Sequence, residues 1–87
     1  MKPTKNLLNK IEDLFAETDY VLRYEKGSFK SGYCILKSTK VVVVNKYYSV
    51  EGKINSLTEI LRQLKPDIDV SKLSEKNQSL LEQLLAQ

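Results

Sequence analysis

Residues 31–45 read Ser-Gly-Tyr-Cys-Ile-Leu-Lys-Ser-Thr-Lys-Val-Val-Val-Val-Asn. Two β-rich runs, Tyr33–Leu36 and Val41–Val44, flank a short polar break, which is typical of a β-hairpin. The four valines favour a strand because β-branched side chains pack well on a pleated surface and lose rotamer freedom in a helix. The hairpin is therefore the element from which the fold is predicted.

The pairing within this hairpin follows from its polar break. A turn centred on Ser38 and Thr39, or a four-residue loop over 37–40, gives the same register. The expected partners are Leu36 with Val41, Ile35 with Val42, Cys34 with Val43, and Tyr33 with Val44. A slip of one residue would exchange the two faces, so the face assignment depends on this turn.

The two faces of the hairpin differ because side chains alternate along a strand. One face carries Cys34, Leu36, Val41 and Val43. The other carries Tyr33, Ile35, Val42 and Val44, together with Lys37, Lys40 and Lys46. We expect two helices to cover the first face. The second face then remains, to be covered by a third helix or by a second copy of the protein.

Three helices are predicted from periodic apolar residues. Leu7, Leu8, Ile11, Leu14 and Phe15 follow the spacing of one helical stripe. They predict a helix over 5–17 that Thr4 caps. A second helix is predicted to begin after Ser49, which is expected to cap it, and to end before Pro66. The residue that precedes a proline disfavours the helical conformation. A linker over 67–70 precedes a third helix at about 71–86.

The remaining strand lies between the first helix and the hairpin. Residues 20–25 predict a strand with Tyr20, Leu22 and Tyr24 on one side. Gly27 favours a turn, and the next strand can begin as early as Phe29, with a bulge or close backbone approach at Gly32. The chain is therefore expected to be a single α+β domain over 1–87, of order α-β-β-β-α-α. The economical packing is a three-stranded antiparallel β-meander with strand two in the centre and helices on one face.

Catalysis finds little support in these residues. The chain has no histidine, and its single cysteine, Cys34, lies in an apolar strand where a buried inert thiol is expected. Its three glycines form no phosphate loop, and no set of zinc or calcium ligands is present in the sequence. We therefore expect no enzyme, no cofactor and no metal. One cysteine excludes an internal disulfide, and no apolar run reaches transmembrane length, so a cytoplasmic protein without membrane contact is expected.

The positive charge is concentrated in the β region. Residues 23–53 hold seven basic residues against two acids, whereas the net charge of the whole chain is +3. Lysines interleaved with tyrosines favour phosphate contacts and base stacking. The element order of residues 5–65 is similar to double-stranded-RNA-binding domains and to the Alu-RNA-binding proteins of the signal recognition particle. The chain departs from the first family, because it has no Gly-Pro-x-His loop and no lysine cluster at the start of the second helix. Solubilising lysines around an apolar hairpin are the alternative interpretation.

A further resemblance covers about half of the chain. It is carried by Arg23-Tyr-Glu-Lys-Gly27, by 29–37, by 40–46 and by Glu51-Gly-Lys-Ile-Asn55. Across 23–61 these segments resemble a family of small uncharacterised bacterial proteins for which no activity is known. The resemblance supplies no function, and it makes residues 23–55 the place to look for one.

Two functions are predicted from this surface. The first is a non-enzymatic protein-interaction module, a homodimer formed through the open sheet face or through the edge of the valine strand. The alternative is a nucleic-acid-binding domain, most simply for RNA, that uses the same basic and tyrosine-containing face. The candidate residues for either partner are Lys30, Tyr33, Ile35, Lys37, Lys40, Val42, Val44 and Lys46.

Overall fold

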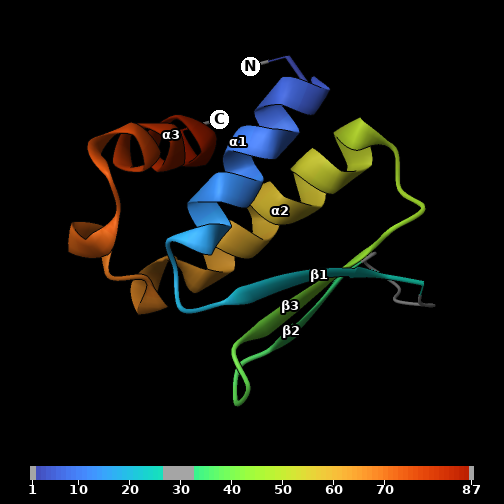
Figure 1. The fold of residues 1–87 in the computed structure, drawn as a ribbon, viewed down its shortest axis with the longest axis horizontal. Helices are drawn as coiled ribbons and strands as arrows, with labels where there is room; N and C mark the ends of the chain where they lie inside the picture. Colours follow the sequence, from blue (N-terminus) through green and yellow to red (C-terminus); the bar gives the residue numbers. More distant parts are fainter. Residues whose placement is uncertain (1, 27–32, 87) are drawn as a thin grey trace.

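The computed structural model describes residues 2–26 and 33–86 and confirms the α+β class and the order of the elements (Figure 1). The helices are α1 (Lys5–Ala16), α2 (Val50–Leu64) and α3 (Glu75–Leu85). The strands are β1 (Val21–Glu25), β2 (Tyr33–Leu36) and β3 (Val41–Asn45). Two single turns of 3₁₀-helix, Lys65–Asp67 and Val70–Lys72, connect α2 to α3.

Side-chain caps fix the starts of the first two helices, as the sequence predicted. The hydroxyl of Thr4 accepts a 3.1 Å hydrogen bond from the amide of Leu7, and the hydroxyl of Ser49 accepts one of 3.1 Å from the amide of Gly52. These contacts satisfy amides that have no partner inside the helix. The end of α2 also follows the prediction, because its last residue stands two positions before Pro66.

The predicted start of the third helix at residue 71 is wrong, because α3 begins at Glu75. Ser71 belongs instead to the preceding 3₁₀ turn, where the carboxylate of Asp69 accepts a 3.1 Å hydrogen bond from the Ser71 amide. The hydroxyl of Ser74 then caps α3 by accepting from the amide of Asn77. Two capping residues, Asp69 and Ser74, lie five positions apart and therefore divide this segment into a 3₁₀ turn and a helix.

The hairpin has the predicted register. Leu36 pairs with Val41, Ile35 with Val42, Cys34 with Val43, and Tyr33 with Val44, all antiparallel. A four-residue turn over 37–40 joins the strands, and the amide of Lys40 donates to the carbonyl of Lys37. Lys40 closes this turn with a φ of 54°, in the left-handed region.

The predicted antiparallel meander with a central second strand is wrong. The sheet is mixed, in the order β1-β3-β2, and β1 runs parallel to β3 from Val21 beside Val41 to Glu25 beside Asn45. The central position suits β3, because its valines are the most deeply buried residues of the sheet. β1 takes an edge, where its charged residues Arg23 and Glu25 remain exposed. The turn, strand start and bulge predicted at 27–32 lie outside the described residues.

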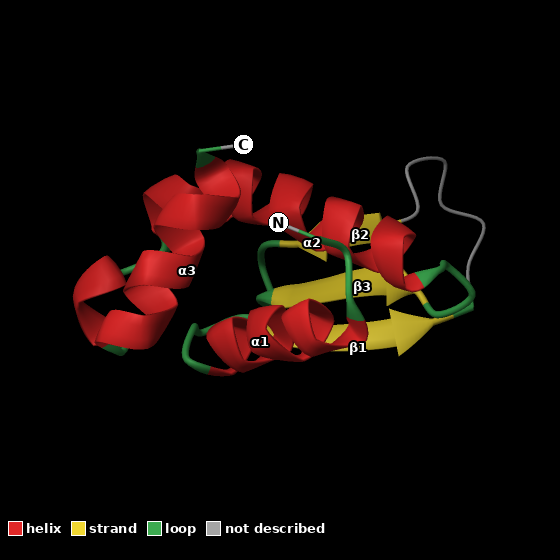
Figure 2. Cartoon of the chain, turned by 90° about the horizontal axis from the view of Figure 1, so that it is seen from above, coloured by secondary structure: helices red, strands yellow, loops and turns green. Residues whose placement is uncertain are grey.

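The helices lie on one side of the sheet, with α1 beside β1 and α2 beside β3 (Figures 1 and 2). α3 packs against α1 and α2 and completes the core. The fully buried side chains come from all three helices and from β3. They include Ile11, Leu14, Phe15, Val42, Val44, Leu57, Ile60, Leu61 and Leu64.

The covered face is the one predicted to stay open. Val42 and Val44 have no exposed surface, and Tyr33 and Ile35 pack against the same core. The pairing with β1 explains this choice, because Leu22 lies beside Val42 and Tyr24 beside Val44. On the opposite face β1 presents Arg23 and Glu25, and burying unpaired charges there would cost several kcal/mol each.

Candidate interaction surface

The open face of the sheet carries a row of apolar side chains across all three strands. Val21 lies beside Val41, and Val41 lies beside Leu36. Val21 is 56% exposed and Leu36 46%, and with Tyr47 they are the large hydrophobic residues that the described part of the chain exposes. Two of these three side chains therefore belong to one continuous row.

A second row on the same face lies two residues further along β1 and β3. It places Arg23 beside Val43 and Val43 beside Cys34. Val43 is only 7% exposed although it lies outside the main core, and Cys34 is half-buried. Among the described strand residues, the open face is thus apolar at its centre, and its charged side chains lie on β1.

The outer edge of β1 presents backbone groups that pair with no strand of the described residues. The amide of Val21 donates a 2.8 Å hydrogen bond to the carbonyl of Lys40, and the amide of Lys46 donates one of 3.1 Å to the carbonyl of Glu25. In a parallel pair the residues that bond to the neighbouring strand alternate with residues that point away. The N–H and C=O groups of Leu22 and Tyr24 therefore point to the outer edge, where the described residues include no further strand.

A groove of about 510 Å³ runs along this edge between α1 and β1. It is lined by α1, by the loop that follows and by β1, without residues of β3 or α2, so it opens on the outer side of the sheet. Its apolar wall includes Phe15, Ala16 and Leu22, and the carboxylates of Glu12 and Asp19 add negative charge. A strand placed beside β1 would direct alternate side chains into this groove.

The side chain of Tyr24 on β1 contacts residues of both neighbouring helices. Its hydroxyl donates a hydrogen bond to the carboxylate of Glu12 on α1, and the ammonium group of Lys53 on α2 lies 5.0 Å from the centre of its ring. Burial and the adjacent Glu12 carboxylate raise the pKa of the Tyr24 hydroxyl. Tyr24 thus connects the middle of the edge strand to both helices.

The predicted partner face is not assembled as expected. Val42 and Val44 lie in the core and contribute no surface, which corrects their assignment to an open face. The hydroxyl of Tyr33 accepts a 2.7 Å hydrogen bond from the amide group of Gln63 on α2, so this ring is turned toward the helices. Ile35 packs on the same side, and its open-face assignment is corrected in the same way.

The predicted lysines are divided between the two ends of β3. Lys37 and Lys40 belong to the turn before this strand and Lys46 follows it, so roughly 15–20 Å of strand separates them at about 3.3 Å per residue. Lys40 pairs with Asp19 at 3.4 Å, and the ammonium group of Lys46 lies 5.2 Å from the ring centre of Tyr47. Lys30 lies outside the described residues. The nucleic-acid function stays a prediction.

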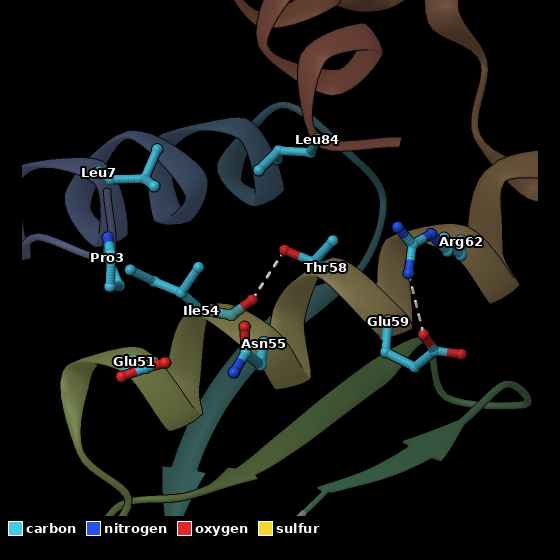
Figure 3. Close-up of a pocket in the computed structure, with 9 residues that line it drawn as sticks. All are labelled: Pro3, Leu7, Glu51, Ile54, Asn55, Thr58, Glu59, Arg62 and Leu84. Carbon is cyan, nitrogen blue, oxygen red and sulfur yellow. Dashed lines mark hydrogen bonds and ion pairs between the residues drawn. The ribbon is translucent and has the colours of Figure 1, made fainter. Parts of the chain in front are cut away.

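A second hollow, of about 430 Å³, lies between the N-terminal segment and the three helices (Figure 3). Two of its polar side chains, Thr58 and Arg62, bond to other residues of α2. Thr58 donates to the carbonyl of Ile54, and Arg62 pairs with Glu59 at 3.4 Å. No cluster of metal-binding side chains occurs in 2–26 or 33–86.

The sequence-based prediction also placed strand one at an edge of the sheet, but it assigned the dimer contact to the edge of the valine strand. That assignment is wrong, because the valine strand β3 lies in the centre of the sheet and has no free edge. The sequence did contain a feature that indicates an exposed edge at strand one. Arg23 and Glu25 occupy one face of that strand, and charged residues in alternation are a common feature of exposed edge strands.

Comparison with family models, with curated proteins and with solved structures gave no match. Among the described residues, no helix has both the length and the apolar character needed to span a membrane.

Proposed function

We propose that this protein is a non-enzymatic interaction module that forms a homodimer by pairing the β1 edges of two copies. The observation that carries the proposal is the outward direction of the backbone groups of Leu22 and Tyr24. Two such edges related by a two-fold axis satisfy each other's hydrogen bonds and join two three-stranded sheets into one of six strands.

Features of β1 support strand addition at this edge. The strand is five residues long, contains no proline, and keeps a continuous register with β3, without a bulge. Strand addition gains affinity from main-chain hydrogen bonds and selectivity from pockets for alternate side chains. The groove between α1 and β1 lies where the partner's alternate side chains would enter.

The first test is the mass of the protein in solution. The chain has a mass of 10.0 kDa, so we expect light scattering at micromolar to millimolar concentration to approach twice this value. A single species of 10.0 kDa across that range would overturn the proposal.

The second test locates the contact through amide hydrogen exchange. In a dimer we expect the amides of Leu22 and Tyr24 to be protected at high concentration and to exchange faster on dilution. The amide of Arg23 is the internal control, because it points toward β3 and keeps its protection in the monomer. A dimer in which Leu22 and Tyr24 exchange freely would place the interface elsewhere.

A substitution that removes the Leu22 amide tests the proposed contact directly. Leu22→Pro removes an outward amide without removing a hydrogen bond to β3, and proline is tolerated on strand edges. We expect it to shift the protein to monomer, whereas Leu22→Ile, which keeps the amide, should remain dimeric. Circular dichroism and thermal unfolding establish that each variant is folded.

A further inference from the structure

We infer that the two β1 strands pair antiparallel with Tyr24 on the two-fold axis, so that Arg23 of each copy faces Glu25 of the other. This inference rests on the proposed function and specifies the partner's register and charge. A two-fold axis perpendicular to the sheet makes the strands antiparallel and keeps both helical layers on one side.

The hydrogen-bonding pattern limits the possible registers. Leu22 and Tyr24 point their backbone groups outward, so even-numbered residues must form the hydrogen-bonded pairs across the new contact. Pairing Tyr24 with the partner's Tyr24 satisfies this condition. The residues on either side, Arg23 and Glu25, then form non-hydrogen-bonded pairs, in which side chains come closest.

Charge selects among the permitted registers. A contact centred on Arg23 brings two arginines together, and one centred on Glu25 brings two glutamates together. A contact centred on Leu22 places Arg23 opposite Val21 and leaves it without an ionic partner. Only the register centred on Tyr24 forms opposite-charge pairs, and symmetry forms them twice.

Opposite charges also approach each other on the groove side of the contact. In this register Leu22 lies opposite the partner's Lys26, which the alternation of an extended chain places on the same face as Leu22. That end of the groove is lined by Asp19, and Lys26 is exposed in the single chain. A cation from each copy thus approaches Asp19 of the other, a carboxylate that also pairs with Lys40 within its own chain, so this contact adds to the pairs on the open face as a smaller contribution.

This arrangement predicts which copies accept each other. Arg23→Glu and Glu25→Arg each place like charges opposite one another twice, and we expect either to raise the dimer Kd on the order of 10-fold. An equimolar mixture of the two variants restores both attractive pairs and should dimerise about as tightly as the wild type. The double variant should also recover. Lys65→Glu makes the same change in charge as Arg23→Glu, at an exposed site off this edge, and is the matched control for that variant.

Sedimentation at low and high salt separates this register from its neighbours. Raising the salt to about 0.5 M should reduce the differences between variants, because exposed charges are screened. If the contact were centred on Arg23, Glu25→Arg would have no charge effect, and Arg23→Glu would prefer the wild-type chain. Either result would overturn the register.

Cross-linking gives an independent readout. In a Cys34→Ser background, Arg23→Cys and Glu25→Cys are mixed and oxidised. Opposed residues of a non-hydrogen-bonded pair have Cα atoms about 4.5 Å apart, which a disulfide spans. We expect a covalent dimer from the mixture and none from either variant alone. Covalent dimer from Arg23→Cys alone would contradict the register, while a wild-type dimer sensitive to Leu22→Pro would still support the proposed function.

Discussion

The side-chain amide of Asn77, at the start of α3, donates a 2.6 Å hydrogen bond to the carboxylate of Glu17, just after α1. The same Glu17 oxygen accepts from the amide and the hydroxyl of Ser74, at 3.0 and 3.1 Å. A carboxylate that follows one helix therefore holds the N-terminus of another, where negative charge is favourable.

Loss of this contact is expected to loosen α3. Glu17→Ala removes all three interactions, and Glu17→Gln keeps an acceptor while removing the charge. We expect faster hydrogen exchange in α3 and a lower Tm for both, with the larger effect in Glu17→Ala. Glu82→Gln, an exposed change on α3, is the control and should leave exchange in the helix unchanged.

The same group should make stability depend on pH. The hydrogen bonds from Asn77 and Ser74 lower the pKa of Glu17. Its stabilising contribution is therefore present above the unfolded pKa and is lost as the pH falls through the folded pKa. Urea unfolding at pH 7 and pH 3 should show a smaller loss of stability in Glu17→Gln than in the wild type. An equal loss in the two proteins would show that Glu17 is not a source of the acid sensitivity.

The left-handed backbone conformation at Lys40 predicts which of two substitutions leaves the protein less stable. Lys40 has a φ of 54°, which glycine adopts freely and a β-branched residue does not. Both Lys40→Gly and Lys40→Val lose the ion pair with Asp19, so the difference between them isolates the backbone term. We expect Lys40→Val to be less stable than Lys40→Gly by about 1–2 kcal/mol in chemical denaturation. Equal stability would contradict the left-handed conformation.

Adjacent valines of β3 test which sheet face is covered. Val42 has no exposed surface, whereas Val41 lies on the open face. We expect Val42→Ala to cost about 2–3 kcal/mol through lost burial and a residual cavity, and Val41→Ala under about 1 kcal/mol. Both changes remove a β-branched residue from the same strand, so each controls for strand propensity. The reverse order of effects would restore the face assignment expected from the sequence.

Contacts between near neighbours were predictable from the sequence. The caps at Thr4 and Ser49 depend on residues three positions apart. The hairpin register depends on the short turn over 37–40, which joins residues at most eleven positions apart. Their geometry follows from hydrogen bonds that the local chain can form in few ways. The helix start at Glu75 was the local feature that the leucine pattern missed, because competing caps at Asp69 and Ser74 decided it.

The sheet order and its covered face were decided only in three dimensions. Both faces of the hairpin are apolar, so alternation along 33–44 cannot choose between them. The choice came from pairing with β1, a strand distant in sequence from β3, whose Arg23 and Glu25 can remain hydrated on one face only. Burial of the β3 valines beneath the helices and hydration of the β1 charges are satisfied together by a single arrangement. That arrangement leaves β1 at the edge, and with it the surface proposed for dimerisation.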